Sequence, residues 1–311
     1  MTISQLEYIL AIAEHKHFGQ AAEDLSVAQS TLSMMVKKLE DELGVVLFDR
    51  NSKPIEATDI GGKVLAQAKH VLAEYHRLQE TVKEYAEELS GEYRLGVIPT
   101  IGPYLIPQLV AILVRDYPEL KLTISEAQTD ELIQMLSDGS LDAAILATPL
   151  KHEKIQEYPL YYEEFYVYGE VDKHGKEFVI PADINPNKLW LLEEGHCLRS
   201  QIVNLCELKE NTDEQIHFEG GGLETLIELV RHYNGLTILP ELALKTMPKK
   251  EQKRVSKFNK PAPYREVSLV THKHAAKFKF IEAIQDVVEE IIPLAMRKLK
   301  QTSRIIEIYE S

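Results

Sequence analysis

The chain has 311 residues, of which 44% are hydrophobic and 27% charged, and its formal net charge is −14. This length suits two or three globular domains, and the acidic balance argues against general adhesion to nucleic acid, so any DNA contact must be local. No apolar run approaches about 18 residues, and the N-terminus lacks a basic segment followed by an apolar one, so we expect a cytoplasmic protein with no membrane partner.

Three helices are predicted at the N-terminus. Ser4 followed by Glu7 is a capping-box pattern for the first of them. Two further helices, near 20–25 and 29–40, are separated by a tight turn, which is the pattern of a helix-turn-helix. The second of these begins with short hydrogen-bonding side chains that suit base edges and phosphates. The candidate DNA-binding residues on it are Gln29, Ser30, Thr31, Ser33 and Lys37.

A plain capped helical hairpin is the alternative interpretation of this region. Residues 1–60 hold five Lys or Arg against ten Asp or Glu, so composition alone does not predict DNA binding here. The case for DNA therefore depends on the order of the residues and not on their overall charge.

Several short runs resemble the LysR-type transcriptional regulators: 20–22, 30–33, 38–50, Thr58 and 61–62. The resemblance implies a winged helix-turn-helix DNA-binding domain over 1–58, with the candidate residues of the second helix facing the groove of double-stranded promoter DNA. It also implies that the wing brings Arg50 and Lys53 to backbone phosphates. The family often has a second arginine in the wing, where this chain has Lys53.

A regular apolar seam follows the wing, with spacings of four and three residues from Ile60 to Leu89. Such a seam is typical of a coiled coil and requires a partner helix. We expect 59–90 to form a linker helix that pairs with a second copy, although a helix that packs on its own domain also fits. The resemblance implies a homodimer and, beyond it, a homotetramer.

Beyond Gly91 the pattern alternates between strands and helices, which indicates an α/β fold. The predicted strands are 93–98, 120–125, 141–147, 165–168, 189–192, 216–219, 237–240 and 267–271, and the predicted helices 103–116, 129–137, 223–233 and 275–300. The resemblance implies a periplasmic-binding-protein-like regulatory domain over 91–304. It would comprise two α/β subdomains, one of about 91–162 and 267–304 and one of about 163–266, with the chain crossing between them near 159–165 and 264–268.

Both cysteines lie in this region, nine positions apart, and Cys197 is expected to begin a helix that contains Cys206. Free N–H groups at a helix start favour a thiolate, and His196 and Arg199 add possible positive charge, so a low thiol pKa is expected. Nine residues of helix rise roughly 13 Å, whereas the Cα atoms of a disulfide are about 4.4 to 6.8 Å apart. If the two cysteines pair, the helix must unwind; the alternative is two inert buried thiols.

The segments 96–107, 126–129 and 195–199, with Cys206, resemble the hydrogen peroxide sensors among the LysR-type regulators. The resemblance implies that peroxide oxidises Cys197 to a sulfenic acid, which then forms a reversible disulfide with Cys206. It also implies that Thr100, Thr129 and His196 hold peroxide. These sensors place an arginine near the reactive cysteine, after the strand at 267–271, where this chain has His272.

As partners, the resemblance implies RNA polymerase, for the activation of antioxidant genes, and thiol reductants such as glutaredoxin or thioredoxin. We expect no turnover enzyme and no cofactor. The histidine pairs at 15 and 17 and at 272 and 274 suggest metal ligands only weakly, so no metal is expected. Besides the peroxide sensor, three alternatives stay open: a LysR-type regulator of a small organic anion with incidental cysteines, a thiol peroxidase, and a metal sensor.

Overall fold

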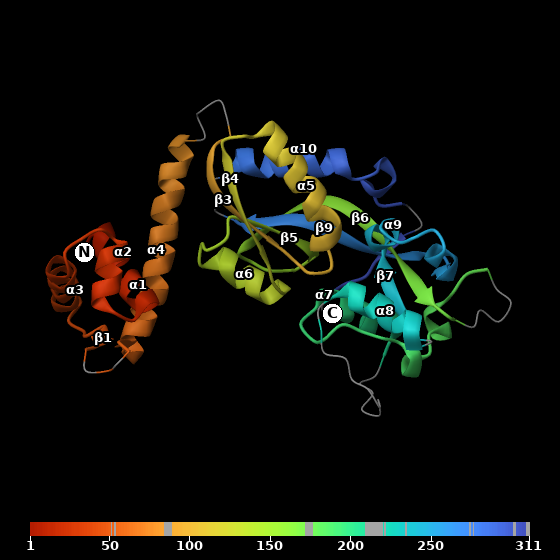
Figure 1. Ribbon diagram of the computed structural model, residues 1–311, viewed down its shortest axis with the longest axis horizontal. Helices are drawn as coiled ribbons and strands as arrows, with labels where there is room; N and C mark the ends of the chain where they lie inside the picture. Colours follow the sequence, from red (N-terminus) through yellow and green to blue (C-terminus); the bar gives the residue numbers. More distant parts are fainter. Residues whose placement is uncertain are drawn as a thin grey trace. The chain divides into compact units, whose positions relative to one another are not determined.

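A computed structural model describes residues 1–50, 52, 54–83, 89–171, 177–208, 220, 222–233, 235–273, 275, 277–300 and 303–308 (Figure 1). The chain divides into two compact units, one of Met1–Tyr85 with Ser137–Gly139 and one of Ala86–Leu136 with Ser140–Ser311. Across the described residues, no helix is both long enough and apolar enough to cross a membrane.

The first unit is a small helical domain with a two-stranded wing. Helices α1 (Ile3–His15), α2 (Phe18–Asp24) and α3 (Gln29–Leu43) are followed by the antiparallel strands β1 (Phe48–Asp49) and β2 (Glu56–Ala57). The apolar side chains of α3 that face the other helices are completely buried: Leu32, Val36 and Leu39. Their spacing of three and four residues explains why α3 buries one face and exposes the other.

The capping box of α1 differs from the predicted one. Thr2 Oγ1 accepts a hydrogen bond from the Gln5 backbone N–H, and the Gln5 side chain accepts one from the Thr2 N–H. The helix begins at Ile3, one residue before Ser4, so Ser4 lies inside the first turn and cannot act as the cap.

Helix α4 (Asp59–Lys83) packs on its own domain through one apolar face. Leu65, Ala68 and Leu72 are buried in the same core as α1, whereas Ile60 and Leu78 of the predicted seam are exposed. Among the described side chains, the helix therefore buries one apolar face and exposes apolar residues of the predicted seam outside it. The homodimer stays a prediction, and so does the linker boundary at residue 90, because residues 84–88 lie outside the described part.

Over its described residues, the second unit is built around an eight-stranded mixed sheet with the strand order β4-β3-β5-β9-β6-β7, in which β10 pairs with β9 and β8 with β6. The strands are β3 (Gly91–Val97), β4 (Leu120–Glu126), β5 (Ala143–Thr148), β6 (Ile155–Gly169), β7 (Leu236–Pro240), β8 (Val255–Lys257), β9 (Ala262–His272) and β10 (Ser303–Ile305).

Helices cover this sheet on both sides. They are α5 (Gly102–Asp116), α6 (Thr129–Ser137), α7 (Cys197–Cys206), α8 (Leu223–Tyr233), α9 (Glu241–Lys245) and α10 (Phe278–Ile291), with single 3₁₀ turns at Pro181–Asp183, Pro186–Lys188, Glu251–Arg254 and Leu294–Met296. Figure 1 shows α5 and α10 together on one side of the sheet and α6 on the other, and α5 and α10 are in contact. The predicted fold class, α/β with an N-terminal winged helix-turn-helix, is confirmed.

Two long antiparallel strands, β6 and β9, join the two parts of the sheet. They pair from Ile155 with His272 to Glu164 with Tyr264, with an irregularity between Pro159 and Tyr161. The far end of β6 pairs with β7 and β8. Both predicted crossings, 159–165 and 264–268, lie within this strand pair, so residues on facing positions of β6 and β9 come together at the centre of the unit.

Three predicted elements differ from the structure or lie outside its described residues. The run 189–192 makes only an isolated bridge between Leu189 and Leu236. Beside it, the Trp190 N–H donates to the Leu236 carbonyl and the Trp190 carbonyl accepts from the Thr237 hydroxyl. The predicted helix 275–300 ends at Ile291, shortly before Pro293, a residue that cannot continue a helix. The predicted strand 216–219 lies outside the described residues.

Candidate functional site

The exposed start of α3 carries most of the predicted DNA-binding residues. Gln29, Ser30 and Thr31 are exposed in its first turn, Ser33 is half-buried, and Lys37 is exposed further along the helix. Ala28 precedes the helix and provides no side-chain cap for the free N–H groups of that turn. Free N–H groups at a helix start, together with short hydroxyl and amide side chains, suit a phosphate or a base edge.

Arg50 follows β1 and is brought back against α3. Its Nη2 donates to Glu40 Oε2 at 2.8 Å, its Nη1 lies 3.5 Å from Ser33 Oγ, and its guanidinium lies 5.3 Å from the centre of the Phe18 ring. Glu40 also accepts a hydrogen bond from the Leu47 N–H, which ties the wing to α3. Arg50 is therefore positioned beside the candidate groove-facing residues, while Lys53 lies outside the described residues.

One histidine of the first pair acts as a helix cap. His17 is the N-cap of α2, and its Nδ1 accepts hydrogen bonds from the N–H groups of Gly19 and Gln20. His274 is outside the described residues. Within the described part of the chain, no three His, Cys, Asp or Glu side chains gather as metal ligands would.

Cys197 is the first residue of α7, after a turn that only glycine fits. Gly195 has a φ of +89°, and a Cβ atom there would lie 2.2 Å from Gln128 Oε1. This close approach presses the turn against the start of α6, whose first residue is Thr129. Thr129 is thereby placed beside Cys197, although 68 residues separate the two in the sequence.

A buried arginine from β9 also faces this site. Arg265 is completely buried, and its Nε lies 2.6 Å from Glu163 Oε2 of the facing β6 strand. Its Nη1 donates to Thr100 Oγ1 at 3.0 Å and its Nη2 to the Thr100 carbonyl at 3.1 Å. Its charge acts on the Cys197 thiol, so the structure brings Thr100, Thr129, Arg265 and Cys197 into one buried site.

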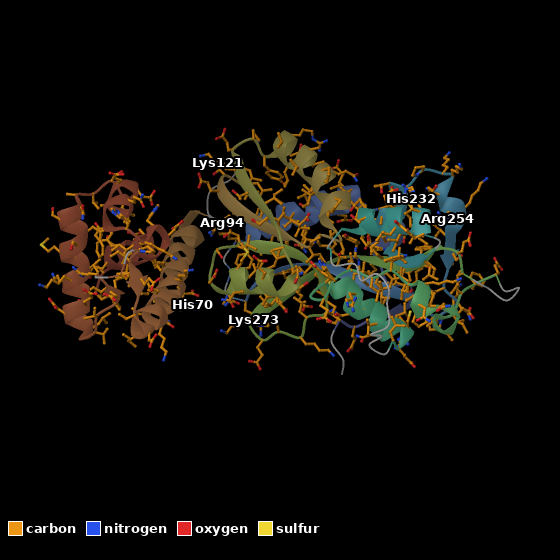
Figure 2. All side chains as sticks on the ribbon, turned by 60° about the horizontal axis from the view of Figure 1, so that its bottom comes forward. His70, Arg94, Lys121, His232, Arg254 and Lys273 are labelled. Carbon is orange, nitrogen blue, oxygen red and sulfur yellow. The ribbon has the colours of Figure 1, made fainter. Side chains whose placement is uncertain are left out.

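Positively charged side chains on the surface are exposed to water, unlike Arg265. Figure 2 labels several of them, among them Lys121, which lies 3.2 Å from Glu92 in a pair whose side chains are 77% and 78% exposed. An exposed pair of this kind contributes about 0 to 1 kcal/mol. Arg265 and Glu163 are both 0% exposed, so neither charge is screened by water and each depends on the other.

His272 does not lie where the resemblance suggested. It ends β9 opposite Ile155, seven residues after Arg265, and seven residues of strand span roughly 23 Å. The arginine beside Cys197 lies before the strand core 267–271 and not after it. The available signal was a pair of charged residues directly before each of two predicted strands: Glu163 and Glu164 before 165–168, and Arg265 and Glu266 before 267–271. Of these, Glu163 and Arg265 are direct cross-strand partners.

Arg199 and the thiol pKa also differ from the expectation. Arg199 Nη1 donates to the Leu192 carbonyl at 2.9 Å, which fixes the chain before the turn. Burial raises the pKa of the Cys197 thiol above its ordinary value; Arg265, Thr129 and the N–H groups of Leu198 and Cys197 act in the opposite direction but do not outweigh it. Burial therefore favours the protonated form of the resting thiol over a preformed thiolate.

Two buried polar atoms close to Cys197 lack hydrogen-bond partners among the described residues: Thr129 Oγ1 and His196 Nε2. The Thr129 hydroxyl makes no hydrogen bond of ordinary geometry, yet it is close enough to lower the pKa of Cys197. The carboxylate oxygen of Glu193 lies 3.5 Å from His196 Nε2. A buried polar atom without a partner costs about 1 to 3 kcal/mol, so a small polar partner at either atom would offset that cost.

Cys206 is the last residue of α7, and both cysteines are free thiols. Burial raises the pKa of Cys206 to about 12. The helix between the cysteines is held by a C-terminal segment: Gln201 Nε2 donates to the Ile306 carbonyl at 2.8 Å, and Asn204 Nδ2 to the Glu307 carbonyl at 3.1 Å. Any unwinding of α7 must break these two contacts.

A winged helix-turn-helix joined by a long helix to an α/β domain with a buried polar site defines a class, the helix-turn-helix regulators with a separate effector domain. The chain belongs to the LysR family of these regulators. Residues 3–62 match the bacterial regulatory helix-turn-helix protein of the lysR family, and residues 86–291 match the LysR substrate binding domain.

Two known regulators are similar to this chain over most of its length. The chain is 39% identical over 305 residues to the hydrogen peroxide-inducible genes activator of Dickeya chrysanthemi, covering 97% of this chain and 100% of the relative. It is 40% identical over 272 residues to the DNA-binding transcriptional dual regulator OxyR of Escherichia coli K12, covering 87% and 89%.

Solved structures agree with these relatives. A full-length OxyR variant from Pseudomonas aeruginosa has a TM-score of 0.74 at 34% identity and covers 93% of this chain and 97% of its own. A hydrogen peroxide-bound cysteine mutant of OxyR from Corynebacterium glutamicum has a TM-score of 0.58 at 31% identity and covers 93% and 92%.

Proposed function

We propose that the protein is a hydrogen peroxide-sensing, DNA-binding transcriptional regulator that activates antioxidant genes and is not a turnover enzyme. The observation that carries this proposal is the buried Cys197 beside Arg265, Thr100 and Thr129, at the opposite end of α7 from the second thiol. The relatives named as peroxide-inducible gene activators and the peroxide-bound OxyR structure support it.

The proposed chemistry uses the residues of this site. Cys197 loses its proton, and the thiolate attacks one oxygen of hydrogen peroxide while the O–O bond breaks. The departing hydroxide takes up a proton and leaves as water, and Cys197 becomes a sulfenic acid. Thr129 and His196, whose buried polar atoms have no hydrogen-bond partner among the described residues, would hold the peroxide, while Arg265 and Thr100 would stabilise negative charge.

The second step couples disulfide formation to a conformational change in α7. Cys206 displaces the hydroxyl of the sulfenic acid, a second water leaves, and a disulfide forms. Because the intact α7 holds the two cysteines roughly 13 Å apart, it must unwind and release its contacts with Ile306 and Glu307. In the proposed regulator this rearrangement alters how a homotetramer binds promoter DNA and contacts RNA polymerase. Thiol–disulfide exchange with glutaredoxin or thioredoxin then reduces the disulfide and restores the resting form.

A regulator of a small organic anion is less well supported. An anion requires an available positive charge, and the charge of Arg265, the arginine at this site, is already matched by Glu163 at 2.6 Å. A small neutral molecule such as hydrogen peroxide requires only hydrogen-bonding groups, which Thr129 and His196 offer.

Mapping the thiols tests the proposed function. We expect about one equivalent of hydrogen peroxide to convert Cys197 and Cys206 of the reduced protein into a disulfide, detected by alkylation and mass spectrometry. The Cys206→Ser variant should stop at a Cys197 sulfenic acid, because the second thiol is missing. Two thiols that stay free after peroxide treatment would contradict the proposal.

A second test concerns the proposed DNA-binding face. We expect Lys37→Ala to weaken binding by a similar factor for all DNA sequences and to reduce the slope of log affinity against log salt by about one, as loss of a single phosphate contact does. Lys121→Ala is the matched control, since it removes an exposed lysine from the second unit. Equal salt slopes for Lys37→Ala and the unaltered protein would exclude a phosphate contact at Lys37.

A further inference from the structure

Glu163 is held rigidly beside Arg265. The two residues face each other on β6 and β9, both are completely buried, and Glu163 Oε2 lies 2.6 Å from Arg265 Nε. The second carboxylate oxygen, Oε1, accepts a hydrogen bond from the Leu242 N–H at 3.3 Å. Glu163 is therefore fixed by two elements and cannot turn away from the guanidinium without losing both contacts.

One guanidinium thus has two possible negative partners, the Glu163 carboxylate and the Cys197 thiolate. The two tyrosines close to it add no charge: burial, followed by the charge of Glu163, raises the pKa of Tyr161 well above its ordinary value, and burial followed by the charge of Glu224 raises that of Tyr104, so both phenols are neutral. His196 has Glu193 at 3.5 Å from its Nε2. In a dry interior the field of Arg265 at the sulfur is partly offset by the Glu163 carboxylate, which lies 2.6 Å from the guanidinium.

We propose that Glu163 acts as a brake on Cys197: it partly neutralises Arg265, weakens the stabilisation that Arg265 gives to a Cys197 thiolate, and so sets the peroxide concentration to which the protein responds. Glu163 is a positioning residue, because it acts through Arg265 and does not touch the sulfur in the described contacts. The inference rests on the proposed peroxide-sensing function and adds the residue that tunes it.

Removing the charge of Glu163 should release the brake. Glu163→Gln keeps the size of the side chain and its hydrogen-bonding oxygen but leaves Arg265 with no carboxylate partner. An opposite charge close to an ionisable group typically shifts its pKa by about 1 to 3 units, so we expect the pKa of Cys197 to fall by at least about one unit. Because a thiolate of lower pKa is also less nucleophilic, the peroxide rate at pH 7 should rise roughly threefold per unit.

The test measures the thiol directly, without peroxide. In full-length protein carrying Cys206→Ser, the rate of Cys197 alkylation by iodoacetamide is followed against pH. We expect the pKa to be highest with Glu163, lower in Glu163→Asp, whose carboxylate lies further from Arg265, and lowest in Glu163→Gln. The matched control is Glu164→Gln, a buried neighbour whose carboxylate accepts from the Tyr264 hydroxyl at 2.9 Å; it should leave the profile unchanged.

The outcomes separate the two proposals. An unchanged or higher Cys197 pKa in a folded Glu163→Gln protein overturns the brake, and the Asp variant decides in the same way if the Gln variant does not fold. A fall in Glu163→Gln that persists when Arg265 is also changed to Gln would likewise overturn it, because the effect must pass through the guanidinium. A lowered pKa in a protein that never reacts with peroxide would support the brake and contradict the sensing function.

Discussion

Replacing Cys197 with serine is expected to abolish the response to hydrogen peroxide completely while leaving DNA binding intact. A serine hydroxyl cannot be oxidised to a sulfenic acid, so neither the first product nor the disulfide can form. The substitution lies in the second compact unit, whereas the helix α3 belongs to the first. The measurement is the expression of a reporter gene, with and without peroxide, beside promoter binding by the purified protein.

Two comparisons make this result specific. Cys206→Ser should also lose the sustained response, but it should still consume one equivalent of peroxide at Cys197, which Cys197→Ser should not. A Cys197→Ser protein with a full peroxide response would contradict the proposal. It would show that the cysteines act only as packing residues and that the regulator responds to another effector.

Replacing Arg265 with methionine is expected to have the largest effect on stability. The change leaves the Glu163 carboxylate completely buried without its partner, and breaking a buried ion pair on one side costs about 3 to 5 kcal/mol. It also removes the hydrogen bonds to the Thr100 hydroxyl and carbonyl. The free energy of unfolding, from urea denaturation of the reduced protein, measures the loss.

The double variant Arg265→Met with Glu163→Gln provides the control. Removing both charges takes away the uncompensated carboxylate, so the double variant should recover part of the stability that Arg265→Met loses. Both variants should react more slowly with peroxide than the unaltered protein, because the Cys197 thiolate loses its positive neighbour. Losses that simply add in the double variant would show that the pair is not energetically coupled.

The burial of the Cys197 thiol has a consequence for selectivity. A thiol with a raised pKa reacts slowly with general electrophiles, because the thiolate is the nucleophile. Reaction with peroxide then depends on groups that bind the peroxide itself, and the unpartnered Thr129 Oγ1 and His196 Nε2 are placed to do so. In the proposed sensor, selectivity for peroxide comes from these hydrogen-bonding groups and not from a freely reactive cysteine.

Local pattern was sufficient for several elements. The predicted helices 129–137 and 223–233 match α6 and α8 exactly, and the helix-turn-helix was predicted from the tight turn and the apolar spacing of α3. The position of Cys197 at the start of a helix and of Cys206 at its end also followed from the sequence. These features depend on residues within a few turns of each other, and the periodicity of the sequence reports that geometry directly.

The tertiary structure alone decided which residues surround Cys197. Arg265 reaches the site because β9 pairs with β6 in a register that sets it opposite Glu163, 102 residues earlier, and no local pattern specifies that register. The hydrogen bonds from α7 to the Ile306 and Glu307 carbonyls also join residues that are far apart in the sequence. The pKa of the Cys197 thiol likewise depends on both local and distant residues. The sequence places Cys197 at a helix start, which favours a thiolate, but burial by distant segments raises the pKa and favours the protonated thiol.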